Sequence, residues 1–168
     1  FLHGFPVYAV SIALAYRNQV QQAVVYDPTR NDLFYASKGR GAFLNERRIH
    51  VSKRTKLEEA LVGTGFPYRV FDHIDTYLAI FKDLTQKTAG MRRPGAASLD
   101  LAYVAAGILG GAISFGHHVW DHAAGVALIR AAGGVVTDLT GEQWTPASSL
   151  ALAGAPGVHA QMLEIVES

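Results

Sequence analysis

One segment, residues 116–134, constrains the fold of this chain more than any other, because it joins a polar loop to an almost uncharged helix. The helix predicted over Ala123–Ala132 carries no charged side chain before Arg130. A helix without a polar stripe is buried nearly all round. Its first half is built from small residues, namely Ala123, Ala124, Gly125 and Ala127, which allow close packing. We therefore expect this helix inside the core, with another element packed tightly against it.

Asp121, at the end of the polar loop, stands where a helix N-cap is expected. Capping needs no ligand, but a carboxylate at the N-terminus of a buried helix is also well placed to hold a cation. His118 and His122 are four residues apart, a spacing that zinc sites on helices use. Because His118 precedes the cap, the two histidines would not share a regular helical face. Zinc is thus disfavoured, while the cap and the cation site both stay open.

Composition excludes several classes of function. The 168 residues carry a net charge of +1 and have no long basic run, so nothing favours nucleic acid or an anionic membrane. The chain has no cysteine, which excludes disulfides and thiolate metal sites and fits a reducing, cytoplasmic compartment. No apolar run reaches the length of a membrane span. The expected partner is a small molecule.

The first 54 residues predict an antiparallel β-meander, because short apolar runs alternate with turn residues. The predicted strands are Val7–Tyr16, Val20–Tyr26, Leu33–Ser37, Ala42–Leu44 and Ile49–Val51. The first two have apolar residues on both faces, yet the meander contains no helix to cover either face. We therefore expect one face to be bare, or covered by helices preceding Phe1 or by another chain.

Residues 57–168 predict a mixed α/β domain, since helical and strand patterns alternate. One strand is predicted to end at Gly63–Pro67. Four more are predicted over Met91–Arg93, Gly110–Phe115, Val135–Asp138 and Leu150–Ala155. Helices are predicted over Asp72–Thr88, Leu99–Ala106, Ala123–Ala132 and His159–Val166. The polar link Lys53–Lys56 separates this part from residues 1–54.

A turn of small residues, Gly95–Ala96–Ala97–Ser98, connects a predicted strand to a predicted helix. Backbone amides at such a helix N-terminus can bind an anion or a sugar hydroxyl without any side chain. Arg92, three residues before Gly95, is within reach of a phosphate, although an arginine at a strand end is commonly just solvated. Alone, the turn is a weak signal.

Taken together, these motifs resemble the inositol monophosphatase family of magnesium-dependent sugar phosphatases. The motifs match the family in order along essentially the whole chain. The matching segments are parts of Val24–Asn45, then Gly63-Thr64-Gly65-Phe66-Pro67, Arg92-Arg93-Pro94-Gly95-Ala96-Ala97, Leu99–Gly107 and Trp120-Asp121-His122-Ala123-Ala124-Gly125. The resemblance implies a layered αβαβα fold, a homodimer and hydrolysis of inositol monophosphate or a related sugar phosphate by metal-activated water.

Carried over by position, the resemblance implies that Asp121 ligates Mg²⁺ and lies near the substrate. It also implies that Gly95, Ala96 and Ala97 line the inositol pocket, with Arg92 near the substrate. Ser114 stands where the family usually has a glutamate that bonds an inositol hydroxyl, so the substrate preference is open. Serine can still donate or accept a hydrogen bond there.

The family's other metal ligands, a glutamate and an Asp-Pro-Leu-Asp-Gly-Thr loop, would precede Phe1. One carboxylate cannot hold a hard cation that needs about six oxygen ligands. We therefore expect residues 1–168 alone to be inactive and the activity to belong to the intact parent protein. The alternatives are a non-catalytic role as partner of the transcription machinery, or a phosphoadenosine or fructose-bisphosphate phosphatase.

Overall fold

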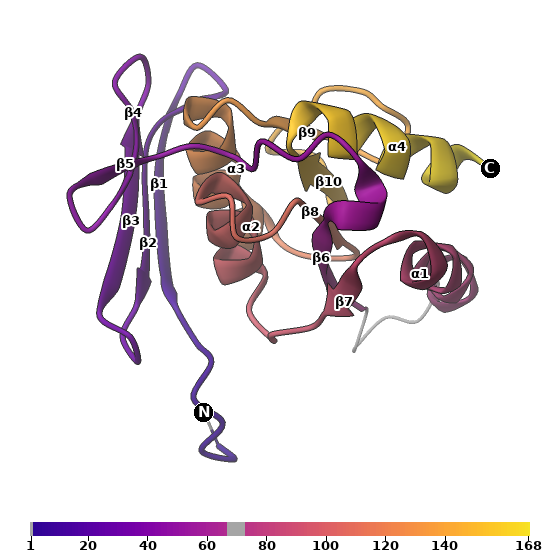
Figure 1. Cartoon of the computed structure of the whole chain (residues 1–168). Helices are drawn as coiled ribbons and strands as arrows, with labels where there is room; N and C mark the ends of the chain where they lie inside the picture. The colour runs from indigo at the N-terminus through magenta and orange to yellow at the C-terminus, as the bar shows by residue number, and fades with distance from the viewer. Residues whose placement is uncertain (1, 67–72) are drawn as a thin grey trace.

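The computed structural model describes residues 2–66 and 73–168, which form two β-sheets and their covering helices (Figure 1). The meander sheet contains β1 (Val10–Tyr16), β2 (Gln19–Asp27), β3 (Asp32–Ser37), β4 (Gly41–Leu44) and β5 (Arg47–Ile49) in chain order, all antiparallel. The predicted meander is confirmed. Its first strand begins at Val10 rather than Val7, and its last ends at Ile49 rather than Val51.

The mixed sheet has the strand order β7-β6-β8-β10-β9. Its strands are β6 (Leu61–Gly65), β7 (Gly90–Arg92), β8 (Gly111–Ser114), β9 (Val135–Thr137) and β10 (Ala151–Gly154). The strands β7, β6 and β8 are parallel, whereas β10 is antiparallel to both β8 and β9. The predicted α/β class is therefore confirmed.

The helices are α1 (Ile74–Lys87), α2 (Ala97–Ala105), α3 (Val119–Ala131) and α4 (Pro156–Glu167), with a short 3₁₀ turn η1 at Leu57–Glu59. Residue 72, where the first predicted helix was expected to start, lies outside the described residues. Helix α2 starts two residues earlier than predicted and α3 four residues earlier. In both cases the polar or small residues at the start belong to the helix.

Two hydrophobic clusters hold the layers together. The first joins the inner face of the meander sheet to α2 and α3 and continues to the mixed sheet, and the second lies between the mixed sheet, α1 and α4. Figure 1 shows the resulting order of sheet, helices, sheet, helices. The expected burial of α3 is confirmed, since the side chains of Val126, Leu128 and Ile129 are fully buried. The division of the chain near residues 54–57 stays a prediction.

The outer face of the meander sheet is bare within the described residues. Val10, Ile12 and Leu14 are 46%, 60% and 56% exposed, and Val24 and Tyr26 are half-buried. On the opposite face of the same strands, Ala23 and Val25 are buried against the helices. The bare face predicted from the two-sided apolar pattern is confirmed.

Helices α2 and α3 approach closely at Gly125. A Cβ atom added at Gly125 would lie 2.4 Å from the Cβ of Leu101, which is too close for any ordinary contact. We expect Gly125→Ala to lower the free energy of unfolding by roughly 2–3 kcal/mol, because overpacking outweighs the gain of about 1 kcal/mol in helix propensity. Urea unfolding followed by circular dichroism measures this difference.

Gly90→Ala is the matched control. There an added Cβ would meet chiefly the flexible end of Arg92, at 3.1 Å, so the loss should be small. If Gly125→Ala proved as stable as the unmodified chain, the two helices would be free to separate, and the close approach would not matter for stability.

Candidate functional site

The parallel strands of the mixed sheet bring two predicted site residues, Arg92 and Ser114, to the same edge as Gly63-Thr64-Gly65. Gly65 at the end of β6 is the register partner of Ser114 at the end of β8, and Arg92 ends β7 on the other side. The carboxyl ends of parallel strands are the usual place for ligands in α/β sheets, because the following loops and helix N-termini converge there. The candidate site therefore lies at this edge.

A small cavity of about 60 Å³, which we call the α2 pocket, lies beside the N-terminus of α2. It is lined by Thr64, Gly65, Phe66, Arg93, Gly95, Ala96, Ala97, Asp100 and His117. Gly95 has φ +107°, a backbone conformation that side-chain-bearing residues rarely adopt, and the turn depends on it. Ala97 is the first residue of α2, where backbone N–H groups have no partner within the helix. The turn can thus present amides to an anion or a hydroxyl.

Ser114 connects two histidines, an arrangement that we call the Ser114 bridge. Its Oγ lies 2.6 Å from Nδ1 of His117 and 2.9 Å from Nε2 of His122. Ser114 and His122 are buried, whereas His117 is half-buried and reaches the α2 pocket. The predicted substrate residue Ser114 therefore does not line the α2 pocket itself, but it contacts His117, which does.

Burial controls the ionisation of this region. It lowers the pKa of His122 to about 4, with His117 adding to the effect and Asp121 opposing it. Burial also lowers the pKa of His117, against the opposing charge of Asp121. The pKa of Asp100 is raised to about 8 by burial, with Arg93 acting in the other direction. At neutral pH the bridge is therefore a set of uncharged donors and acceptors, and Asp100 is largely protonated.

Asp121 lies in the first turn of α3, three residues after the N-cap His118. The prediction that Asp121 is itself the N-cap is wrong, because the helix begins at Val119. Its Oδ2 instead accepts a hydrogen bond from the backbone N–H of His118 at 3.0 Å, which is the acidic arm of a capping box. The carboxylate is half-buried, so solvent and ligands can reach it.

The two arginines at the end of β7 differ in position. Arg92, the residue expected near substrate, donates from Nη1 to the carbonyl of Met91 at 2.9 Å and does not line the α2 pocket. Its neighbour Arg93 does line the pocket and stacks over the ring of Phe66 at 3.8 Å. The structure therefore brings Gly95, Ala96 and Ala97 together at the pocket but leaves Arg92 outside it.

Six of the nine pocket residues were not among the predicted site residues, including its three titratable side chains, Arg93, Asp100 and His117. The sequence did contain a signal for Asp100, since an acidic residue in a helix that is otherwise apolar has few ways to be solvated. His117 directly precedes His118 in the sequence, and no pattern there marked it as a pocket residue. No pattern in the sequence distinguished Arg93 from Arg92.

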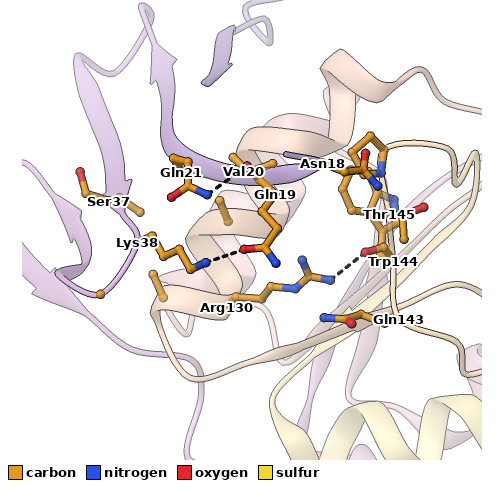
Figure 2. A pocket seen from close by; sticks show the side chains of 15 residues that line it. Asn18, Gln19, Val20, Gln21, Ser37, Lys38, Arg130, Gln143, Trp144 and Thr145 are labelled. Carbon is orange, nitrogen blue, oxygen red and sulfur yellow. Dashed lines mark hydrogen bonds between the residues drawn. The ribbon is translucent and has the colours of Figure 1, made fainter. Parts of the chain in front are cut away.

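A larger cleft, of about 450 Å³, lies at the other end of α3 (Figure 2). It contains Lys38 and Arg130, but each already has a partner: Lys38 donates to Oε1 of Gln19, and Arg130 donates to the carbonyl of Trp144 at 2.9 Å. Arg130 comes nine residues after Asp121, roughly 14 Å along the helix axis. Although this cleft is roomier, none of the predicted site residues line it. We therefore place the candidate site at the α2 pocket.

The fit to a metal ion is incomplete. Among residues 2–66 and 73–168, no three His, Cys, Asp or Glu side chains come together to hold a metal. His118 stacks on Trp120, and His122 faces Ser114, so these two histidines do not form a zinc site. A magnesium ion takes oxygen ligands, and Asp121 can supply one of them. The described residues alone do not complete a magnesium site.

Comparison with known proteins identifies the family. The profile of the Inositol monophosphatase family matches residues 1–168. The chain is 51% identical over all its 168 residues to the putative Nus factor SuhB of Neisseria meningitidis serogroup B, and spans 64% of that protein's length. It is 40% identical over 167 residues to an inositol-1-monophosphatase of Mesorhizobium japonicum, of which it covers 63%.

Among solved structures, the extragenic suppressor protein suhB of Bartonella henselae superimposes with a TM-score of 0.95 at 38% identity. The superposition covers 99% of this chain and 64% of that one. No helix of the described residues is long and apolar enough to cross a membrane. The sequence match over the whole chain and the shared fold lead to one conclusion: this chain belongs to the inositol monophosphatase family.

Proposed function

We propose that the full-length protein hydrolyses inositol monophosphate or a related sugar phosphate monoester in a magnesium-dependent reaction. The observation that carries this proposal is the α2 pocket itself. It joins the Gly95–Ala97 turn at a helix N-terminus to the carboxyl ends of β6 and β8, within a chain of the inositol monophosphatase family. Helix N-termini at such an edge bind phosphate and hydroxyl groups.

Each site residue has a proposed task. The amides of the Gly95–Ala97 turn bind the polar substrate, and Arg92 with Arg93 supplies positive charge at the end of β7. Ser114 acts from beneath the pocket through its contact with His117. Asp121, held by its hydrogen bond from the N–H of His118, directs its carboxylate toward a cation and the reacting phosphate.

When bound, magnesium polarises the phosphate, lowers the pKa of a bound water and stabilises the leaving alkoxide. The proposed contribution of this chain is narrower. Asp121, which is not among the residues that line the α2 pocket, offers one carboxylate ligand, and the pocket orients the alcohol portion of the substrate. We expect residues 1–168 without further ligands to show no turnover, since one carboxylate does not satisfy the coordination of Mg²⁺.

Metal removal tests the proposal. We expect the full-length protein to release phosphate from inositol monophosphate with Mg²⁺ present and to lose at least 99% of that activity in excess EDTA, because the ion generates the nucleophile. Adding back Mg²⁺ should restore the rate. Phosphoadenosine phosphate and fructose bisphosphate, assayed in parallel, decide between inositol phosphates and the related substrate classes. Activity that is indifferent to EDTA would contradict magnesium dependence.

A non-catalytic role is the second candidate, because several relatives carry the name Nus factor. For this chain we would infer a role as partner of the transcription machinery if the full-length protein, loaded with Mg²⁺, hydrolysed none of these substrates. We also propose a homodimer, on the strength of the family alone. Light scattering of the full-length protein gives its mass directly.

A further inference from the structure

The α2 pocket contains two polar groups that have no hydrogen-bond partner within the described residues. Oδ1 of Asp100 is buried without a partner, and no hydrogen bond is found for Nε2 of His117. A buried polar atom without a partner is uncommon, so Oδ1 of Asp100 calls for an explanation. Nε2 of the half-buried His117 is not among the buried unpartnered atoms and is open to a ligand or to water. Both residues line the same cavity, so a polar group in it would lie next to both side chains.

The size of the cavity limits what that group can be. A volume of about 60 Å³ holds a few groups of the size of a water molecule, each of which needs roughly 10–15 Å³ by the same measure. It is far smaller than the roughly 300–1,000 Å³ of pockets that enclose a whole small molecule. A hydroxyl projecting from a larger substrate does fit.

The ring of His117 is held in one orientation. Its Nδ1 is fixed by Ser114 at 2.6 Å, and its Cε1 would lie 3.1 Å from a Cβ added at Gly65, so a side chain at residue 65 would crowd the ring. Ser114 in turn is fixed by the fully buried His122 at 2.9 Å. The Ser114 bridge therefore leaves Nε2 as the free nitrogen of His117.

The chemistry of the bridge favours a hydroxyl partner. Ser114 has one hydroxyl proton, so it can donate to only one of the two imidazoles and must accept from the other. Nε2 of a neutral His117 is then an N–H donor in one arrangement and an acceptor in the other. A hydroxyl satisfies either arrangement because it both donates and accepts, whereas a carbonyl or an ammonium group satisfies only one.

We propose that His117 determines substrate specificity by binding, through Nε2, a hydroxyl of the alcohol portion of a polyol phosphate in the α2 pocket. Ser114 and His122 are positioning residues that fix the ring of His117, and Asp100 contacts the same hydroxyl. This inference rests on the proposed phosphatase function. It assigns recognition of the hydroxyl to residue 117, whereas the sequence resemblance pointed to position 114.

The kinetic test uses the full-length protein and two substrates, inositol monophosphate and phenyl phosphate, which has no hydroxyl on its alcohol portion. We expect His117→Leu to lower kcat/KM for inositol monophosphate about tenfold, the loss typical of one hydrogen bond to a substrate. The value for phenyl phosphate should stay within about twofold. His50→Leu, at an exposed histidine outside the pocket, should change neither value.

The positioning residues are tested by Ser114→Ala and His122→Phe. Both should reduce the preference for inositol monophosphate over phenyl phosphate in the same direction as His117→Leu. The urea unfolding midpoint of Ser114→Ala should fall, because the buried Nε2 of His122 loses its partner, but the variant should still unfold in a single cooperative transition. An equal loss on both substrates in His117→Leu would assign that residue to phosphate chemistry and overturn the inference. The inference would also be wrong if His117→Leu changed neither kcat/KM value, which would mean that only water occupies the cavity.

A binding measurement separates this inference from the proposed function. Free inositol, which has hydroxyls but no phosphate, should shift the imidazole ¹⁵N resonances of His117 in the full-length protein, and this shift should vanish in Ser114→Ala. That result supports hydroxyl binding at His117 even if the protein hydrolyses no phosphate ester. Unshifted His117 resonances at saturating inositol, in a protein that hydrolyses inositol monophosphate, would overturn the inference and leave the proposed phosphatase activity intact.

Discussion

Asp121→Asn is expected to lower the proposed magnesium-dependent phosphatase turnover of the full-length protein by a factor of about a hundred to a thousand. Losing the charge of a proposed metal ligand should raise the barrier by roughly 3–4 kcal/mol, and each 1.4 kcal/mol is a factor of ten in rate. Measuring kcat with inositol monophosphate at saturating Mg²⁺ gives the effect. The variant should also need more Mg²⁺ to reach half of its maximal rate.

The fold should survive this substitution. Oδ2 of Asp121 accepts a single hydrogen bond, from the backbone N–H of His118, and the side-chain oxygen of asparagine can accept the same bond. The only stability lost is the favourable interaction of a negative charge with the helix N-terminus, which contributes about 0.3–1 kcal/mol to the free energy of unfolding. Thermal unfolding should therefore shift by only a few degrees.

Asp75→Asn is the matched control, because Asp75 is an exposed acidic residue in the first turn of α1 and lies outside the pocket. It repeats the loss of charge at a helix N-terminus without touching the candidate site. Turnover should be unchanged in this variant. If Asp121→Asn kept near-normal magnesium-dependent activity, Asp121 would be no more than the acidic arm of a capping box.

The meander sheet was predictable from the sequence because its signals are local. Two-sided apolar strands separated by turn residues such as Asp27-Pro28 define both the hairpins and the bare outer face. The start of α3 was less predictable. Asp121 has the side chain of an N-cap, and the sequence cannot show whether it bonds forward as a cap or backward to the N–H of His118, as it does.

The arginines show why the pocket was only partly predictable. Successive residues at a strand end point in opposite directions, so an uncertainty of one residue decides whether Arg92 or Arg93 lines the cavity. The Ser114 bridge was not predictable at all. It depends on the loop between β8 and α3 folding His117 back over Gly65, a contact between residues 52 positions apart.

Asp100→Asn is expected to make the stability of the chain less dependent on pH. Burial raises the pKa of Asp100 to about 8 in the folded state, from the ordinary value of 3.8. Between these two values the folded chain keeps a proton on Asp100 that the unfolded chain releases. Because the unfolded state binds fewer protons, stability falls as the pH rises through this window, and the loss is complete above pH 8.

The size of the effect follows from the same linkage. A single proton gives at most about 1.4 kcal/mol per pH unit, so raising the pH from 5.5 to 8.5 should cost the unmodified chain about 2–4 kcal/mol through Asp100. Asparagine has nearly the same shape and does not ionise. The free energy of unfolding of Asp100→Asn, minus that of the unmodified chain, should therefore grow by that amount over this range when both are measured in urea.

Taking the difference between the two chains cancels the titration of the histidines, which both share. Asp75→Asn, at an exposed site, should show a difference that is the same at both pH values. If the free energy of unfolding of Asp100→Asn changed with pH in parallel with that of the unmodified chain, Asp100 would be ionised in the folded state throughout this range. Its unpartnered Oδ1 would then have to be solvated through the α2 pocket. The outcome thus reports directly whether that cavity is wet enough to stabilise a buried charge.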